Sequence, residues 1–353
     1  MFYGGYDGVN LLDKEARRFT DRSTSVESGS AGYGGAASNF VSPCFLTNMN
    51  GIGDANNQIN SYKTAVKIVT DPLTSPMYIL ALPGQREPNV TDYAAQKVSD
   101  FGRAFYIMDI PAYDSDSVRI FDGETNRFID NQITARTFDA RAIDNGAVAV
   151  YHPSVTIEDP INDKRTVVPA SVAALSVYGF NDRTTYPWYA AAGLNRGALS
   201  FVKAVSQKTK ASDKNLFSDT RINPILKDEG IYIIFSQFTL KQGSNALTSR
   251  VNVKRLSIEI SRMISSVGYP VIFENYTKAA RDSLSKALEN KFSFLQQTKA
   301  ISSFRVICDD TNNTTADKEN HKINVRIRVK PIESIEYVDL SFVITRSGTF
   351  LIS

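Results

Sequence analysis

The sequence contains few of the residues on which metal and redox sites usually depend. Two cysteines, Cys44 and Cys308, and two histidines, His152 and His321, occur among 353 residues. The cysteines are far apart and have neither zinc-site spacing nor the density of a disulfide framework, so we interpret both as buried thiols of a reducing compartment. Neither histidine has a second ligand at metal-binding spacing. These absences argue against a zinc site and a disulfide-stabilised domain.

A strong excess of one charge and a long apolar run are also missing. The net charge of +3 is too small to indicate nucleic acid or a membrane surface as the partner. No stretch approaches the roughly 20 apolar residues of a membrane span, and the residues after Met1 lack the pattern of a signal peptide. We therefore expect a globular chain, long enough for two or three domains with a sizeable core.

Residues 1–55 are rich in Gly, Ser and Asn, which predicts a long loop. After them, apolar spacing alternates between the helical and the buried-strand type. The pattern predicts helices over 56–70, 90–101 and 127–144 and strands over 77–82, 104–109 and 147–152. This order is typical of a largely parallel sheet with right-handed crossovers. Residues 155–165 are predicted to be turns, and a helix is predicted over 172–180 after Pro169.

Two polar residues end predicted parallel strands, where open α/β sheets usually bind ligands. They are Asp109 and His152, with Asp114 and Asp116 nearby in the sequence. One interpretation is an acid–base or metal site. The other is that both side chains hydrogen-bond to the adjoining loops.

The segment 187–197 contains the only Trp of the chain. Pro187 restricts the backbone, and the two glycines permit positive φ or close backbone approach. We therefore predict an ordered crossing between two domains. The residues expected to shape this junction are Trp188, Gly193, Asn195, Arg196 and Gly197.

Beyond this segment, helical and strand patterns alternate again. We predict the start of a helix at 212–217, an extended turn at 222–225, a strand over 231–235 and a short strand at 271–273. A helix over 250–267, capped by Ser249 and ended by Gly268, is expected to expose its basic residues to solvent, and Thr277 is expected to cap a helix over 278–297.

The end of the chain has strand patterns around a polar loop. Strands are predicted over 304–308, 322–330 and 337–345, the last able to pair with its own sheet or with a neighbour's edge. The Asp- and Asn-rich loop at 309–320 lacks the spacing of a calcium loop, so a turn held by side-chain to backbone bonds is favoured.

Six stretches of the second half together resemble the contractile tail sheath proteins of bacteriophages and related injection machines. In family order these stretches are 187–197, 222–225, 250–256, 273–275, 308–314 and 331–345. Two stretches of the first half, 4–8 and 82–84, add weaker similarity.

The resemblance implies a middle α/β domain over about 1–185, with a largely parallel sheet, and an inner α+β domain over 186–353, with an antiparallel sheet. It implies a structural subunit that polymerises around the tail tube and contracts to drive the tube through the host envelope, without a catalytic residue or a cofactor. Its partners would be further copies, the tail tube, and the baseplate and tail terminator proteins, in a virion tail assembled in the host cytoplasm.

The same resemblance implies two kinds of interface. In the family a charged helix contacts the tube, and terminal arms add strands to the sheets of neighbouring subunits. Here the tube-facing candidates are Lys278, Arg281, Lys286 and Glu289, and the candidates for contact with neighbours are Tyr337, Val338, Leu340, Phe342 and Ile344. The family's Gly-Gly-x-Asp-Gly stretch begins here at residue 4, so we expect a fragment without the N-terminal arm that does not form long sheaths by itself.

Two other functions stay open at this point. One is a doubly wound α/β enzyme or nucleotide-binding protein, with its ligand near 82–84. The other is a nucleic-acid-binding module that uses the basic face of 322–330, although no aromatic residues accompany that face.

Overall fold

The computed structural model describes residues 57–120, 127–159, 164–243, 247–332, 334, 343–344 and 350–351. The chain divides into two compact units, Met1–Pro270 and Val271–Ser353.

A five-stranded sheet forms the centre of the first unit. Its order is β1 (Ile79–Ala81), β2 (Phe105–Met108), β5 (Val148–His152), β9 (Ile222–Asp228) and β10 (Ile231–Ile234). The first four strands are parallel and β10 runs antiparallel to β9. The predicted parallel sheet is therefore confirmed.

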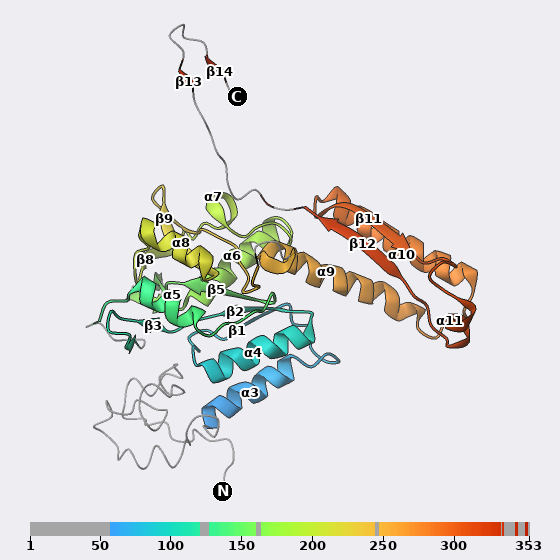
Figure 1. The fold of residues 1–353 in the computed structure, drawn as a ribbon, viewed down its shortest axis with the longest axis horizontal. Coiled ribbons are helices and arrows are strands. Elements are labelled where there is room, and N and C mark those ends of the chain that lie inside the picture. The colour runs from blue at the N-terminus through green and yellow to red at the C-terminus, as the bar shows by residue number, and fades with distance from the viewer. Residues whose placement is uncertain are drawn as a thin grey trace. The chain divides into compact units, whose positions relative to one another are not determined.

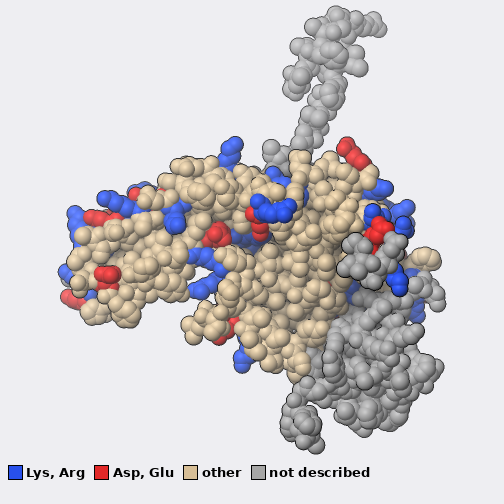
Figure 2. Space-filling model, turned by 180° about the vertical axis from the view of Figure 1, so that it is seen from behind, with Lys and Arg blue, Asp and Glu red and all other residues tan. Residues whose placement is uncertain are grey.

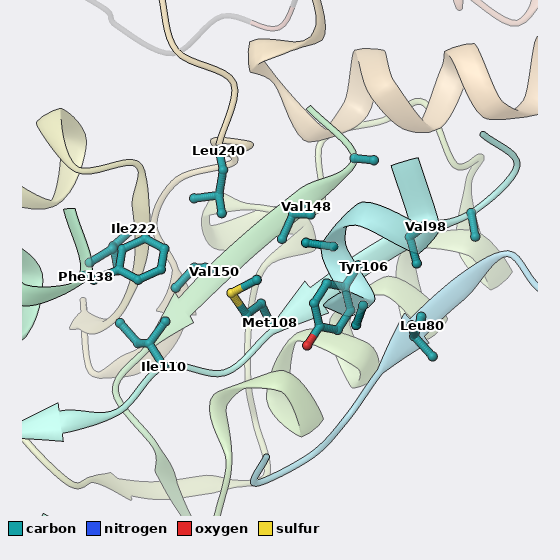
Figure 3. Packing of buried hydrophobic residues seen from close by; sticks show 14 of the residues in the cluster. Leu80, Val98, Tyr106, Met108, Ile110, Phe138, Val148, Val150, Ile222 and Leu240 are labelled. Atoms are coloured by element: carbon teal, nitrogen blue, oxygen red, sulfur yellow. The ribbon is translucent and has the colours of Figure 1, made fainter. Parts of the chain in front are cut away.

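Helices cover both faces of this sheet (Figure 1). One face packs against α4 (Pro88–Phe101), α5 (Asn131–Asp139) and α8 (Ala211–Asp219), with α3 (Asn57–Val69) beside α4. The other face packs against α6 (Ala170–Thr184) and α9 (Val251–Gly268). All four residues of β2 are buried, because successive side chains enter opposite clusters. Figure 3 shows Tyr106 and Met108 in the first cluster, beside Val148 and Val150 of β5.

Strand β9 corrects the prediction of an extended turn at 222–225. Pro224 and Asn223 are typical of turns, but the Asn223 amide is buried and supplies strand-like bonds. Its Nδ2 donates to the carbonyl oxygens of Val150 (3.0 Å) and Phe238 (2.8 Å), and its Oδ1 accepts from the Phe238 N–H (2.6 Å). A side chain therefore provides part of the bonding that the sequence pattern lacks.

A second, antiparallel sheet replaces the turns predicted at 155–165. It has the order β7 (Lys164–Val168), β6 (Val155–Asp159), β8 (Val202–Val205). The first four residues of β7 are exposed and the fifth is half-buried, so its sequence has the polar character of a loop. Smaller elements of this unit are β3 (Ala112–Tyr113), β4 (Arg119–Ile120), α7 (Gly193–Arg196) and η3 (Leu247–Ser249).

The second unit is much simpler. Helix α10 (Lys278–Gln297) packs on a two-stranded antiparallel sheet, β11 (Ile301–Ile307) and β12 (Arg326–Pro331), whose connection contains α11 (Thr315–Glu319). A separate pair, β13 (Val343–Ile344) and β14 (Phe350–Leu351), lies near the C-terminus. The predicted strand at 271–273 is wrong: η4 (Tyr269–Val271) is a 3₁₀ turn, and Ile272 and Phe273 after it are exposed.

The predicted domain boundary at 185/186 lies inside the first unit. Strands β9 and β10 come from the second half of the chain, yet they complete the sheet begun by β1, β2 and β5. Parallel pairing joins strands that are far apart in sequence, so a sequence pattern alone does not reveal this connection.

Candidate assembly surfaces

Helix α10 has the capped, amphipathic form that its sequence predicts. The Thr277 hydroxyl accepts a hydrogen bond from the Ala280 N–H (3.1 Å), which satisfies one donor of the first turn. Phe292 stacks on Phe304 of β11 with ring centroids 5.6 Å apart. The buried stripe consists of Leu284, Leu288, Phe292 and Leu295.

The predicted tube-facing residues of α10 do not all have the same environment. Lys278, Lys286 and Glu289 are exposed, whereas the Arg281 side chain retains 11% of its exposure and its Nη2 lies 2.7 Å from Asp310 Oδ1. The hydrogen bond to Asp310 raises the pKa of Arg281. Arg281 therefore ties the loop after β11 to the helix, and the three other side chains lie on the solvent face.

The β11–β12 sheet has two outer edges without a strand neighbour among the described residues. Pairing runs from Ile301 opposite Pro331 to Ile307 opposite Arg326, and neither strand has a second partner there. Unpaired edges present main-chain N–H and C=O groups, and so they can accept a strand from another chain.

The alternation predicted for 322–330 is confirmed within β12, although the strand begins at Arg326. Ile327 and Val329 are half-buried, whereas Arg326, Arg328 and Lys330 are exposed. The sheet thus has an apolar face packed on α10 and a basic face open to solvent.

The polar loop after β11 is held by its own side chains, as predicted. Asn312 Nδ2 donates to the carbonyl oxygens of Ile307 and Asn324, both at 2.8 Å, and Asn313 Nδ2 donates to Asn324 O at 2.9 Å. Asp309 accepts from the Thr311 N–H at 2.9 Å. In the part of the chain that the structure describes, no group of three His, Cys, Asp or Glu side chains is placed to hold a metal ion. Cys308 is buried, as predicted, and burial raises the pKa of its thiol; Cys44 lies outside the described residues.

Most of the predicted contacts with neighbours lie outside the described residues. These are Tyr337, Val338, Leu340 and Phe342. Ile344 belongs to β13, where it pairs antiparallel with Phe350 of β14. Backbone pairing at the very end of the chain is therefore present in the single chain.

The segment 187–197 is an ordered packing element of the first unit. Trp188 is buried and stacks on Tyr186 with centroids 4.7 Å apart. The fully buried Asn181 of α6 donates to the carbonyl oxygens of Tyr186 (3.2 Å) and Tyr189 (3.3 Å). The predicted order is confirmed, and the segment lies within one compact unit.

The end of this segment depends on its glycines. Gly193 has φ +75°, and a Cβ on Gly197 would lie 2.7 Å from the Ala192 backbone. Arg196 Nε donates to Ala190 O at 2.9 Å, and Asn195 is exposed. Gly197 O accepts from the Ile234 N–H at 2.9 Å, so the segment is bonded to β10.

Asp109, directly after β2, forms its hydrogen bonds within the protein. The buried Asp109 carboxylate accepts from the Gly84 N–H (3.0 Å), the Ser171 N–H (2.9 Å) and the Ser171 hydroxyl (2.6 Å). Burial raises the pKa of Asp109, although the Arg86 charge and these bonds oppose the shift. Asp109 thus occupies the N-terminus of α6, where an anionic ligand would otherwise bind. The loop-bonded interpretation of Asp109 is confirmed.

His152 is likewise part of an internal network. Its Nε2 lies 3.2 Å from Asn131 Oδ1, and Asn131 Nδ2 donates to Asp213 Oδ2 at 2.8 Å. Because Asn131 Oδ1 is an acceptor only, Nε2 carries the proton. Burial, followed by the Arg86 charge, lowers the pKa of His152 to about 4. The neutral imidazole joins the starts of α5 and α8 to the end of β5.

Two arginines of α9 correct the prediction of a solvated basic face. Arg255 is buried, pairs with Asp182 and lies over the Tyr178 ring. Arg262 donates to the carbonyl oxygens of Met77, Pro76 and Arg103 at the ends of β1 and β2. The sequence did contain one signal for these internal contacts. The two arginines are seven residues apart, which places both on one face of the helix. The predicted Ser249 cap is also absent, because α9 begins at Val251 with no side-chain cap bond.

Charged side chains of both signs are scattered over the described part of the face in Figure 2, with uncharged surface between them. Within the described ranges, no helix has both the length and the apolar character needed to cross a membrane.

Comparison with known proteins shows similarity to the tail sheath proteins of bacteriophages. Residues 244–345 match the family model of the phage tail sheath C-terminal domain. The tail sheath protein of Vibrio phage KVP40 is 27% identical over 188 residues, which are 53% of this chain and 28% of that protein. The tail sheath protein of Enterobacteria phage T4 is 26% identical over 194 residues, 54% of this chain and 29% of that protein. The chain therefore aligns with less than a third of the length of these relatives.

Solved structures with the same fold come from contractile machines. The contracted sheath complex of an extracellular contractile injection system, PVC, has a TM-score of 0.63 at 16% identity and covers 82% of this chain and 76% of its own. The contracted helical sheath of the anti-feeding prophage has a TM-score of 0.59 at 20% identity and covers 82% of this chain and 75% of its own. At these identities the similarity establishes the fold.

Proposed function

We propose that this chain, a relative of phage tail sheath proteins whose residues 244–345 match the C-terminal domain of that family, is a structural subunit of a contractile tail sheath. Copies would polymerise helically around a tail tube and contract to drive it through the host envelope. The subunit would act in the virion tail after assembly in the host cytoplasm, with the tube, baseplate and tail terminator proteins as further partners.

The observation that carries this proposal is the open β11–β12 sheet of the second unit. A two-stranded sheet on a single helix is a small structure, and a third strand would extend its hydrogen bonding and its apolar face. An arm from a neighbouring subunit would supply such a strand at an edge that has no partner among the described residues. The strand pattern at 337–345 provides a candidate arm in each copy.

Strand addition suits a lattice that shortens. Main-chain hydrogen bonds would hold the arm to its neighbour while whole subunits pivot relative to one another. Free energy stored in the extended lattice at assembly would be released through new contacts between subunits, without a nucleotide cofactor. In this proposal no residue has a catalytic role.

The exposed face of α10 is the proposed contact with the tube. Lys278, Lys286 and Glu289 lie on it, opposite the buried stripe. Arg281 is assigned instead to the loop after β11, because its ion pair with Asp310 already uses its guanidinium.

The enzyme alternative requires the first unit to bind a nucleotide near 82–84. Two groups that could contact its phosphates, the Gly84 N–H and the first turn of α6, already form hydrogen bonds within the protein. The Gly84 N–H, in the stretch proposed for nucleotide contact, donates to Asp109, and Asp109 caps α6. A saturable rise in melting temperature with nucleotide would favour this alternative. Steeply salt-dependent binding of DNA or RNA would favour the nucleic-acid alternative.

The test combines sedimentation with electron microscopy. The chain and a variant that ends at Ile332 are compared alone and with assembled tube protein of the same particle. The described strands and helices of the second unit's α10–β12 core all precede the deletion. We expect concentration-dependent association and a regular coat on tubes for the chain, and monomers without a coat for the variant. A chain that stays monomeric and leaves tubes bare would contradict the proposal.

A further inference from the structure

The solvent face of the β11–β12 sheet carries one sign of charge only. Neither strand contains an acidic residue. We use the name basic face for its four exposed cationic side chains, Arg305, Arg326, Arg328 and Lys330.

Two of these side chains are placed unfavourably for the isolated chain. Arg305 of β11 stands directly opposite Arg328 of β12 in the strand register, and like charges at such positions destabilise a sheet. None of the four side chains forms a hydrogen bond or an ion pair with another described residue. The Asp309 carboxylate lies within the electrostatic reach of Arg305, but no described residue forms an ion pair with Arg326, Arg328 or Lys330. A carboxylate brought to these three side chains would relieve the repulsion.

The sequence of the C-terminal segment contains a carboxylate in the required position. In 337–345 the even positions are all apolar, namely Val338, Leu340, Phe342 and Ile344. The odd positions carry the polar residues of the segment, with Asp339 as the only charged one, and are Tyr337, Asp339, Ser341, Val343 and Thr345. A strand of this pattern, added to the sheet, would place its apolar side with the face that packs on α10. Its other side, with Asp339, would then lie on the basic face.

We propose that residues 337–345 of a second copy add beside β12, and that Asp339 pairs with Arg328 on the basic face. This inference rests on the proposed function, since it takes strand addition between copies as given. Strand β12 is favoured over β11 because it holds three of the four cationic side chains. Arg328 is its central one, so a carboxylate opposite it is also diagonal to Arg326 and Lys330.

The pair selects both the face and the register of the added strand. A slip by one residue would turn Asp339 toward the apolar face and expose Val338 and Leu340 to solvent. A slip by two would keep the face but would place the carboxylate at the end of the cationic row. The partner of the basic face is thus an acidic, amphipathic strand of this same protein.

Disulfide trapping between two differently tagged copies tests the position directly. Cys44 and Cys308 are first replaced by Ser and Ala, and copies with Arg328→Cys and Asp339→Cys are mixed and oxidised. We expect heterodimers in non-reducing gels, and roughly fivefold fewer with Arg305→Cys or Val329→Cys in place of Arg328→Cys, since disulfides need Cβ atoms within about 4.5 Å. Equal yields at the three positions, or trapping only within single chains, would overturn the inference.

A charge swap provides a second test that needs no cysteine. Asp339→Lys should weaken association of the otherwise unchanged chain by about two- to fivefold, and adding Arg328→Asp should restore it. Arg305→Asp in the same background is the control and should restore less. Failure of Arg328→Asp to restore association would contradict the pairing. If unmodified copies associate but trap elsewhere, only this inference fails; if no copies associate or trap, the proposed function fails with it.

Discussion

The central sheet of the first unit and the small sheet of the second differ in how completely they are covered. Every residue of β2 is buried between two layers of helices, whereas β12 alternates between half-buried and exposed residues along its whole length. One sheet has helices on both faces, and the other has one helix, one basic face and two edges. The first unit therefore has a complete core among the described residues, whereas we propose that the second gains stability from a strand of another copy.

The largest expected effect comes from removing a core aromatic residue from each unit. Phe105→Ala in β2 removes an edge contact with Tyr178, and Phe292→Ala in α10 removes the stack on Phe304. Each should lower the free energy of unfolding of its own unit by about 3–5 kcal/mol. Because the second unit has the smaller core, we expect Phe292→Ala to unfold α10 while the first unit stays folded.

Hydrogen exchange followed by mass spectrometry measures the two units separately in one sample. Peptides from β2 should keep their protection in Phe292→Ala, and peptides from α10 should lose it. Loss of protection in both units from either single substitution would show that their stabilities are coupled, and the comparison would then be wrong.

Acid is expected to weaken the first unit through His152. Its pKa is lowered to about 4 in the folded chain, against 6.5 when unfolded, so the unfolded state binds the proton more readily between these values. Stability is then fully present above pH 6.5 and falls by roughly 3 kcal/mol as the pH drops toward 4. Urea unfolding of the first unit across this range measures the slope.

The matched variants for this titration are His152→Gln and His321→Gln. Glutamine at 152 offers an N–H to Asn131 but does not titrate, so its slope between pH 6.5 and 5 should flatten. His321 is exposed in the second unit and its replacement should leave the slope unchanged. An identical slope in all three chains would remove His152 as the cause.

A glycine pair probes how tightly the first unit is packed. Gly197→Ala places a Cβ 2.7 Å from the Ala192 backbone, and the overlap should cost about 1–3 kcal/mol. Gly179→Ala, in α6 with no atom within 4 Å of its Cβ, should instead stabilise by about 0.5–1 kcal/mol. Thermal unfolding measures the stability of the two variants. An unchanged stability of Gly197→Ala would show that the backbone of 187–197 can move to accommodate the added Cβ.

The smallest effect concerns the cap of α10. Thr277→Ala removes the bond to the Ala280 N–H and should destabilise the second unit by about 1 kcal/mol. Ser283→Ala, exposed in the middle of the same helix, should have no destabilising effect because Ala is the better helix former. Hydrogen-exchange rates of α10 amides measure this difference in stability. Equal rates in the two variants would show that the Thr277 cap does not stabilise the second unit.

Local patterns were sufficient for much of the fold. The bounds of α10 agree with the prediction and those of α9 differ by one residue at each end, because helical periodicity, caps and stops involve residues within a few positions of one another. The alternation of β12 is of the same kind. The parallel order of β1, β2 and β5 was inferred instead from the succession of helices and strands, because a helical crossover returns the chain to the same end of the sheet. For the candidate surfaces, the sequence identified the exposed face of α10 and the basic row of β12.

What the sequence could not provide depended on partners far away along the chain. The pairing of β9 with β5, the arginines of α9 on the carbonyl oxygens near β1, and the bond of Arg281 to Asp310 join residues separated by about 30 to 190 positions. From the sequence alone, a charged residue beside an apolar stripe is predicted to be exposed to solvent. Only the tertiary structure shows whether a hydrogen-bond acceptor from a distant part of the chain lies next to it. Periodicity therefore determined which elements form and which faces are apolar, and only the tertiary structure decided which polar groups are already bonded and which are left for another protein.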